Sequence, residues 1–295
     1  MRVGVTLLPE HAWEQDRHRW KRAEQYGFDH AWTFDHLAWR SLADSAWYAT
    51  IPTLVAAALE TSALRLGTWV TTPNFRHPVP LAKELMTLDR MSSGRLNIGL
   101  GAGAQGWDAS VLGQPAVTPA QASDRFSEFV TVLDLLLTQP RTTWQGQWFS
   151  AADARNIPGP VQRPRPPFII AANGPKGIRL AVDQAEGWAT MGTAGRDAEE
   201  EAWWAGAREA SERCDDALSA AGRAANSIAR YLNLEVLSTS LTSIEHFRHL
   251  AGRAGELGFT DVVIAWPRPT GPFAGDEQIL EDIAADLARV RRVRS

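Results

Sequence analysis

Cysteine is almost absent from this chain of 295 residues. The one cysteine, Cys214, lies in the charged stretch SERCDDALSA, so no disulfide can form within the chain. The sequence also contains no HExxH motif, no Cys/His cluster, no GxSxG elbow and no P-loop, which argues against a metal centre and against the common nucleophiles. We therefore expect no bound metal, a reducing cytoplasmic location, and chemistry that comes from a cofactor.

Long apolar runs are missing as well. No stretch approaches the roughly 18 apolar residues of a membrane span, and the apolar run in the N-terminal MRVGVTLLPEH is too short for a signal peptide. The net charge is −4, and lysine occurs only at Lys21, Lys83 and Lys176, whereas a nucleic-acid-binding protein carries a concentrated basic face. We expect a soluble protein that binds neither membranes nor nucleic acids.

Tryptophan, in contrast, is abundant, with 13 residues. Most of them should pack in the core. Four lie at or just beyond the ends of predicted strands, where they could form aromatic walls around a planar ligand, namely Trp32, Trp39, Trp69 and Trp107.

Strand and helix patterns alternate eight times along the chain. The predicted strands are Arg2–Leu8, His30–Phe34, Leu64–Val70, Leu96–Leu100, Phe168–Ala172, Gly187–Thr190, Tyr231–Leu237 and Asp261–Trp266. The predicted helices are Ala12–Tyr26, Tyr48–Leu59, Val79–Met91, Ser123–Leu137, Gly177–Gln184, Ala198–Ala221, Ser243–Leu257 and Asp276–Val290. This alternation of strands and helices predicts an α/β fold, a (β/α)₈ TIM barrel in a single domain over residues 1–295. A doubly wound open sheet is the alternative.

The segment 138–166 interrupts this alternation of strands and helices. It has no periodic helix pattern, and its RPRPP run favours extended backbone. A connection of this length is usually functional, so we interpret it as an insertion that forms a lid or an interface arm.

The stretch RLNIGLGAGAQG at Arg95–Gly106 is an apolar strand that runs into a glycine loop. Glycines at the carboxyl end of a strand allow a flat or anionic ligand to approach bare backbone, and active sites of (β/α)₈ barrels lie at this end. Gly101 and Gly103 are therefore candidate cofactor contacts. A purely structural strand-to-helix turn is the alternative.

Three further groups of candidates follow other predicted strands. Asp35, His36 and Trp39 follow the second strand, where a histidine beside a carboxylate can act as general acid or base; local backbone contacts are the alternative. Small polar groups that could bond a ligand follow the third strand, and the stretch AANGPKG places amides, glycines and a lysine at a helix start, where anions bind. The candidates in these last two groups are Thr71, Thr72, Asn74, Ala172, Asn173, Gly174, Lys176 and Gly177, joined by Thr190 and Gly192 after the sixth strand.

Taken together, these segments resemble the bacterial luciferase-like flavin monooxygenase superfamily over nearly the whole chain. The resemblance is carried by GFDHAWTFDH, HPVPLAKELMTLDRMSSGRLNIGLGAG, WDASVLG, RFSEFVTVLDLLL and QRPRPPFIIAANGPKGIRLAVDQAEGW. It implies the (β/α)₈ barrel, often dimeric. The motifs around His36, Thr71 and Asn173 look most like the branch that uses coenzyme F420, a deazaflavin.

That resemblance implies roles for individual residues. His36 and Trp39 would line the substrate side of the deazaflavin ring, and Trp69–Val70 would be a non-prolyl cis peptide bond behind it. Gln105 and Trp107 would line the substrate pocket, and the fifth- and sixth-strand loops would hold the phosphate. The sugar-phosphate dehydrogenase of this branch has a catalytic Glu where this chain has Ala104, and its histidine-to-tryptophan spacing is one residue longer, so we do not expect sugar-phosphate oxidation.

The sequence thus predicts an enzyme that transfers a hydride between F420 and a small organic substrate and that forms a homodimer. Two alternatives stay open. One is an FMN-dependent two-component monooxygenase, which needs a flavin reductase as partner, and the other is a non-catalytic flavin-binding protein of the same fold.

Overall fold

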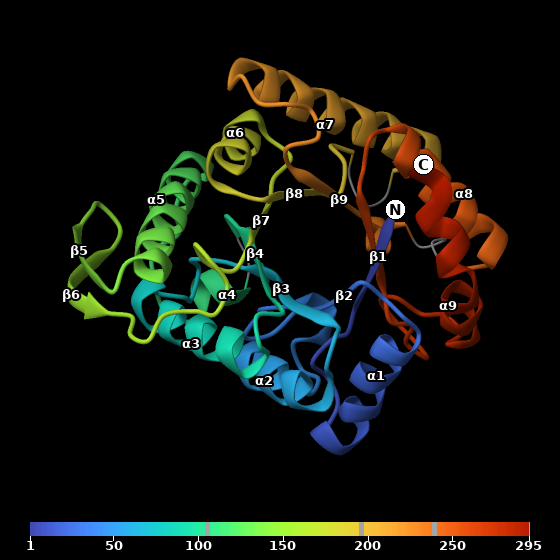
Figure 1. Ribbon diagram of the computed structural model, residues 1–295, viewed down its shortest axis with the longest axis horizontal. Coiled ribbons are helices and arrows are strands. Elements are labelled where there is room, and N and C mark those ends of the chain that lie inside the picture. The colour runs from blue at the N-terminus through green and yellow to red at the C-terminus, as the bar shows by residue number, and fades with distance from the viewer. Residues whose placement is uncertain (104–106, 195–197, 238–240, 295) are drawn as a thin grey trace. The chain divides into compact units, whose positions relative to one another are not determined.

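The computed structural model describes residues 1–103, 107–194, 198–237 and 241–294. Eight parallel strands form a closed barrel in the order β1, β10, β9, β8, β7, β4, β3, β2 (Figure 1). They are β1 (Arg2–Thr6), β2 (His30–Thr33), β3 (Arg65–Thr71), β4 (Leu96–Gly101), β7 (Phe168–Ala171), β8 (Gly187–Thr190), β9 (Ala229–Asn233) and β10 (Asp261–Ala265). The predicted α/β fold, a (β/α)₈ barrel, is confirmed.

Helices follow the strands along the chain. Their bounds are α1 (Trp13–Gln25), α2 (Thr50–Glu60), α3 (Pro78–Met91), α4 (Trp107–Ser110), α5 (Pro119–Thr138), α6 (Pro175–Gln184), α7 (Glu200–Ala220), α8 (Ile244–Glu256) and α9 (Gln278–Val290). The short helix α4 has no counterpart among the predicted helices. The predicted strand Tyr231–Leu237 is wrong beyond Asn233, because residues 234–236 form a 3₁₀ turn.

The chain divides into two compact units. The first comprises Met1–Leu7, Arg19–Trp32 and Ile169–Ser295, and the second comprises Leu8–His18 and Thr33–Phe168. In the first unit, β1 pairs with β10 in a parallel register that runs from Arg2 opposite Asp261 to Thr6 opposite Ala265. That a single domain spans residues 1–295 stays a prediction.

The first unit contains a buried polar network among its strands. Asp261 is fully buried, and its carboxylate accepts hydrogen bonds from His30 Nε2 at 3.0 Å and from Arg2 Nη2 at 2.8 Å. Trp32 Nε1 donates to His30 Nδ1 at 2.6 Å, so the proton of this imidazole lies on Nε2. Gly4 provides the space for His30, since a Cβ at Gly4 would collide with the ring.

The second unit contains β3 and β4, which pair in parallel with a register shift between Thr68 and Thr71. Helix α3 begins as expected from its sequence: His77 is the N-cap and accepts from the Val79 amide at 3.2 Å, and Pro78 is the first helical residue. These caps fix where the chain leaves the carboxyl ends of the strands, which is where the candidate site residues lie.

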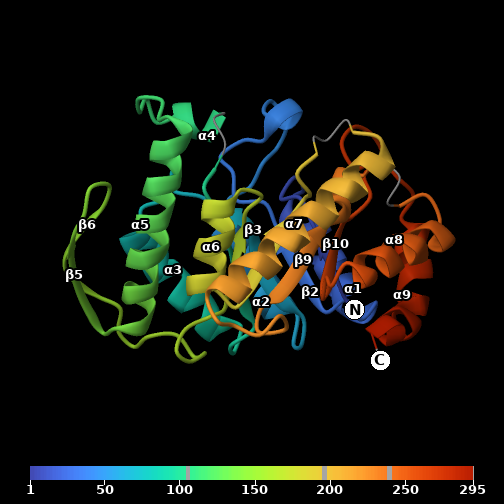
Figure 2. The ribbon, with the colours of Figure 1, turned by 90° about the horizontal axis from the view of Figure 1, so that it is seen from above.

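The segment 138–166 contains an antiparallel hairpin formed by β5 (Arg141–Gln145) and β6 (Ser150–Arg155). The hairpin lies beside α5 (Figures 1 and 2). Its tip is held by the Glu128 carboxylate of α5, which accepts the backbone amides of Gln147, Trp148 and Phe149 at 2.9–3.2 Å. A Cβ at Gly146 would collide with this carboxylate, so a larger residue there would push Glu128 away from the tip.

Candidate active site

His36, three residues beyond β2, forms a pair with Asp108 of α4. Its Nδ1 contacts Asp108 Oδ2, and Asp108 Oδ1 accepts the Leu37 amide at 2.7 Å. The Trp47 indole donates to the His36 carbonyl at 2.9 Å. The Asp108 side chain is 8% exposed, whereas that of His36 is 27% exposed. A buried carboxylate therefore fixes one side of an imidazole whose other side is accessible.

Asp35 has a different role from the one that its position next to His36 indicates. It is buried and accepts hydrogen bonds from Thr71 Oγ1 at 2.8 Å and from Arg76 Nη2 at 2.7 Å. Burial alone would lower the pKa of Arg76, but the Asp35 charge outweighs it and raises that pKa. The carboxylate that contacts His36 is thus Asp108, and Asp35 ties the end of β2 to the end of β3.

Aromatic side chains surround His36 within the second unit. Trp39 is buried and stacks on Trp47 at 6.3 Å between ring centroids, with 23° between the ring planes. Phe34 packs edge-on against Trp39 at 5.1 Å and against the His36 ring at 6.1 Å. These contacts hold the imidazole in one orientation. Trp107, in contrast, is 55% exposed, and Gln105 and Ala104 lie outside the described residues.

Glycines at and just after the end of β4 allow residues at and after the end of β3 to pack closely against this part of the chain. The Trp69–Val70 peptide bond is cis, as the family resemblance implied. A Cβ at Gly101 would lie 2.6 Å from Val70 Cγ2, and Gly103 has φ +73° with its Cβ position 2.5 Å from Asn74 Nδ2. The two glycines therefore make room for the Val70 side chain and for the side-chain amide of Asn74, which fill the space that a Cβ would take.

Arg125 of α5 adds a buried positive charge next to Asn74. Its Nη2 donates to Asn74 Oδ1 at 2.5 Å, and its Nε is buried with no hydrogen-bond partner among the residues that the structure describes. Burial lowers the pKa of this guanidinium. Because a buried charge is costly without a counter-charge, this position attracts the negative charge of a ligand.

In the first unit, the stretch AANGPKG forms the turn from β7 into α6. Gly174 is the N-cap of α6, and a Cβ there would meet nothing within 4 Å. Gly177 packs against Ala172, whose Cβ would lie 2.7 Å from a Cβ at Gly177. Lys176 is exposed in the first turn of α6. The amides of this first turn are open to an anion.

Thr190, at the end of β8, lies beside this turn. Its hydroxyl donates to Asn173 Oδ1 at 2.7 Å and accepts the Gly192 amide at 3.0 Å. Gly192 has φ +79°, which glycine adopts without strain. The structure therefore joins the sixth-strand candidates to the fifth-strand candidates. In the second unit, the Thr72 hydroxyl accepts a hydrogen bond from the backbone N–H of Asn74 at 3.3 Å.

Two residues of the site are absent from the sequence-based candidates: Asp108 and Arg125. Both lie within segments that carry the family resemblance, WDASVLG and RFSEFVTVLDLLL. The sequence offered a signal for each: Asp108 is an acidic residue directly after the glycine loop, and Arg125 begins a largely apolar helical segment. Within the described ranges, no group of three or more His, Cys, Asp or Glu side chains could hold a metal ion, and no helix there is long and apolar enough to cross a membrane.

A closed parallel barrel, with polar side chains after β2, β3 and β4 in one unit and after β7 and β8 in the other, defines the class of (β/α)₈ proteins, whose sites lie at the carboxyl ends of the strands. The comparison with family profiles narrows this class to one family, because the profile described as luciferase-like monooxygenase matches residues 1–242. The chain belongs to the luciferase-like monooxygenase family.

Two of the relatives that match this chain are named as F420-dependent dehydrogenases. An F420-dependent glucose-6-phosphate dehydrogenase of Microbacterium testaceum (strain StLB037) is 33% identical over 216 residues, which are 72% of this chain and 61% of that protein. An F420-dependent hydroxymycolic acid dehydrogenase of Mycobacterium tuberculosis is 31% identical over 198 residues, 63% of this chain and 51% of that protein. The matched segments span about half to three fifths of these relatives' length.

Solved structures agree on the fold. An F420-dependent secondary alcohol dehydrogenase in complex with an F420–acetone adduct superposes with a TM-score of 0.81 at 18% identity, covering 99% of both chains. The F420-dependent tetrahydromethanopterin reductase of Methanopyrus kandleri superposes with a TM-score of 0.74 at 20% identity, covering 96% of this chain and 97% of that one. At this level of identity the likeness establishes the barrel fold only.

Proposed function

We propose that this protein is an oxidoreductase that transfers a hydride between coenzyme F420 and a small organic substrate. The observation that carries the proposal is the accessible imidazole of His36, which is fixed through Nδ1 by the buried Asp108. The F420-dependent relatives and the family membership support it. The family resemblance implies that Ala104 stands where the sugar-phosphate dehydrogenase of this branch has its catalytic Glu, so the substrate we propose is not a sugar phosphate.

Two sets of residues, each within one unit, fit two parts of the cofactor. Val70 and Gly101, which pack against each other, form an apolar surface that suits a flat ring. The α6 amides after Gly174, with Thr190, suit a phosphate. When bound, coenzyme F420 would supply the carbon that accepts or donates the hydride.

His36 would handle the proton that accompanies the hydride. With Nδ1–H donated to Asp108, Nε2 carries the lone pair and can take a proton from a substrate hydroxyl; in the reverse direction it returns that proton. The Asp108 carboxylate stabilises the positive imidazolium formed in between. Phe34 and Trp47 contact the imidazole and would hold it in place, and Trp39 packs on both of these rings.

A titration followed by absorbance and fluorescence tests the cofactor. Saturable binding of F420 with a spectral change is the expected result. Saturable binding of FMN without any response to F420 would overturn the proposal and favour the two-component monooxygenase, in which case reduced FMN should generate peroxide.

Two variants test the role of His36. His36→Ala should bind F420 and lose turnover by about 100-fold or more, measured as reduction of F420 by a panel of alcohols or oxidation of reduced F420 by a panel of carbonyl compounds. Asp108→Asn should lower kcat about 10- to 100-fold with little change in KM, because it affects only the orientation and charge of the imidazole. His18→Ala, an exposed histidine of α1, is the control. Turnover of His36→Ala equal to that of His18→Ala would contradict the assignment.

Two further proposals concern the oligomeric state and the cellular location of the protein. We propose that the protein forms a homodimer, which sedimentation at several concentrations would test. The single cysteine, Cys214, is a buried free thiol, which supports a cytoplasmic setting.

A further inference from the structure

Exposed apolar side chains gather next to the His36–Asp108 pair in the second unit. Nine large hydrophobic side chains are exposed among the residues that the structure describes. Four of them lie within four positions of His36 or Asp108 along the chain and are 45–55% exposed, namely Leu37, Trp107, Val111 and Leu112. We call these four side chains the apolar rim. Exposed hydrophobic residues that are scattered singly need no explanation, but a group of them marks a binding surface.

Backbone hydrogen bonds hold the rim against the pair. The Leu37 amide donates to Asp108 Oδ1 at 2.7 Å, and Trp107 directly precedes Asp108 in α4. The Val111 amide donates to the Trp107 carbonyl at 2.9 Å. The β2–α2 connection and the end of α4 therefore bring apolar side chains to one carboxylate. A substrate that reaches Nε2 of His36 has this rim beside it.

The segment that carries most of the rim exposes no charge. Residues 107–123 read WDASVLGQPAVTPAQAS, in which the only charged residue is Asp108, and Asp108 is buried. Residues 111–116 are all exposed, and a Cβ at Gly113 would meet nothing within 4 Å. Charged residues make up 22% of the whole chain, so an exposed stretch of this length ordinarily carries several. A charged ligand would find no counter-charge on this segment, whereas an apolar ligand would be removed from water.

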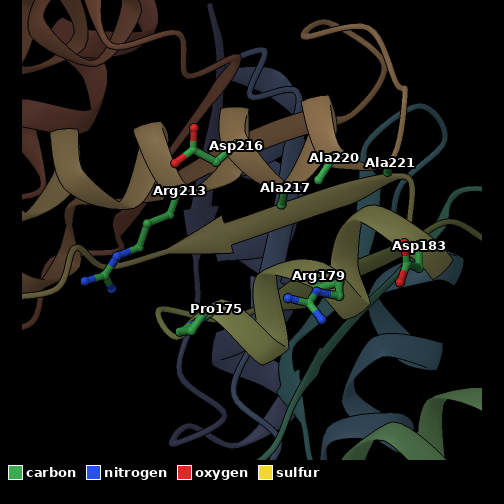
Figure 3. A pocket seen from close by; sticks show the side chains of 8 residues that line it. All are labelled: Pro175, Arg179, Asp183, Arg213, Asp216, Ala217, Ala220 and Ala221. Carbon is green, nitrogen blue, oxygen red and sulfur yellow. The ribbon is translucent and has the colours of Figure 1, made fainter.

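The first unit offers a contrasting surface. A groove of about 430 Å³ lies between α6 and α7, and its lining includes Arg179, Asp183, Arg213 and Asp216 (Figure 3). An apolar ligand in this groove would displace water from charged groups without replacing their hydrogen bonds, which is costly. Of these two surfaces, the apolar rim is therefore the one that suits an apolar ligand.

We propose that the substrate of this enzyme is an alcohol or ketone with an apolar chain, and that the apolar rim binds this chain. The inference rests on the proposed function, since it places the substrate oxygen at Nε2 of His36. Leu37, Val111 and Leu112 would then remove the chain from water. Each methylene that the rim buries should tighten binding about threefold to fourfold, from the free energy of burying such a group.

Binding of a ketone series tests this proposal without turnover. The probes are 2-butanone, 2-hexanone and 2-octanone, each titrated into the protein together with oxidised F420, because two oxidised compounds cannot exchange a hydride. Calorimetry should show a dissociation constant that falls about tenfold for each pair of added methylenes, with a negative change in heat capacity. The polar ketone 1,3-dihydroxyacetone should bind more weakly than 2-butanone. High salt should not weaken binding, since no ion pair takes part.

Matched substitutions of two exposed leucines test the rim itself. Leu112→Ser should weaken binding of 2-octanone about fivefold to tenfold and change that of 2-butanone less than about twofold, because only the longer chain reaches over the rim. Val111→Ser should have a similar effect. Leu59→Ser makes the same change on α2, where Leu59 is 69% exposed, and should alter neither affinity. All three variants should bind F420 as the unaltered protein does.

The outcomes distinguish this inference from the proposed function. Equal affinity for the three ketones, or equal effects of Leu112→Ser and Leu59→Ser, would overturn the rim as a substrate site and leave the proposed function intact. A dimer that dissociates in the Leu112→Ser variant, measured by sedimentation, would also overturn it, because a second copy of the chain would then cover the rim. Failure to bind F420 would overturn the proposed function and, with it, the assignment of a bound ketone as substrate.

Discussion

Replacement of Asp261 with asparagine should destabilise the first unit strongly, because this buried carboxylate accepts hydrogen bonds from both His30 and Arg2. A hydrogen bond to a charged group contributes about 1.5–3 kcal/mol. The His30 side chain is 3% exposed, so its hydrogen bond to Asp261 should contribute this full range. The Arg2 side chain is 50% exposed, so its ion pair with Asp261 contributes at most about 1 kcal/mol after screening by solvent. The expected loss is therefore about 3 kcal/mol.

This loss should appear as a lower midpoint of thermal unfolding. At roughly 2 °C or more per kcal/mol for a chain of this size, Asp261→Asn should unfold about 6 °C or more below the unaltered protein at pH 7. Circular dichroism measures the midpoint. The control is Glu201→Gln, which removes an ion pair with Arg253 that has short contacts of 2.5 and 3.0 Å but an 80% exposed carboxylate. Its midpoint should not change.

The pH dependence gives the sharper test. Burial alone would raise the pKa of Asp261, but hydrogen bonds from His30 and Arg2 outweigh burial and lower that pKa. A carboxyl group with a lowered folded-state pKa stabilises the fold above its ordinary pKa of about 4 and loses this effect as the pH falls through the folded-state value. The gap between the two midpoints should thus be full at pH 7 and shrink below about pH 4. Equal midpoints at pH 7, or a gap that persists in acid, would refute the reasoning.

Three other perturbations have defined outcomes. Cys214 should resist a thiol reagent at pH 8 in the native protein and react after denaturation, because burial raises its pKa to about 11; fast native labelling would contradict this. Glu128→Gln should increase hydrogen exchange at the hairpin amides such as Phe149, since a neutral amide is a weaker acceptor, and unchanged exchange would argue against the clamp. Gly101→Ala should weaken cofactor binding at least tenfold in a titration, because its Cβ would lie 2.6 Å from Val70; undiminished affinity would exclude close approach of the ring.

The sequence was sufficient for the barrel because the strands and helices alternate with a clear period and carry their own boundary signals. Pro78 and Gly27, which has φ +78°, mark a helix start and a helix end that the structure reproduces. The hairpin was not predictable from periodicity. Its strands are mostly exposed on both faces, so they lack the alternation of apolar and polar residues that identifies a half-buried strand.

The pairing at His36 was also beyond the sequence. Asp35 is its neighbour in the chain, yet the carboxylate that contacts the imidazole belongs to Asp108, 72 positions away. Chain proximity favoured the wrong carboxylate because alternate residues at a strand end point in different directions. Asp108 lies on a helix of four residues, which is too short to produce a periodic signal.

The way the hairpin is attached makes it an exchangeable part. The backbone amides at its tip depend on one side chain, Glu128, which belongs to α5 and not to the barrel strands. A designer could therefore replace residues 141–155 with another hairpin of similar length, provided that its tip offers free amides to this carboxylate, keeps a glycine at the position of Gly146 and keeps the ring of Phe149, which packs on Phe129 and His77. The same arrangement would let the segment diverge between related proteins without any change in the barrel, so the hairpin is a natural place for this fold to acquire a new binding surface.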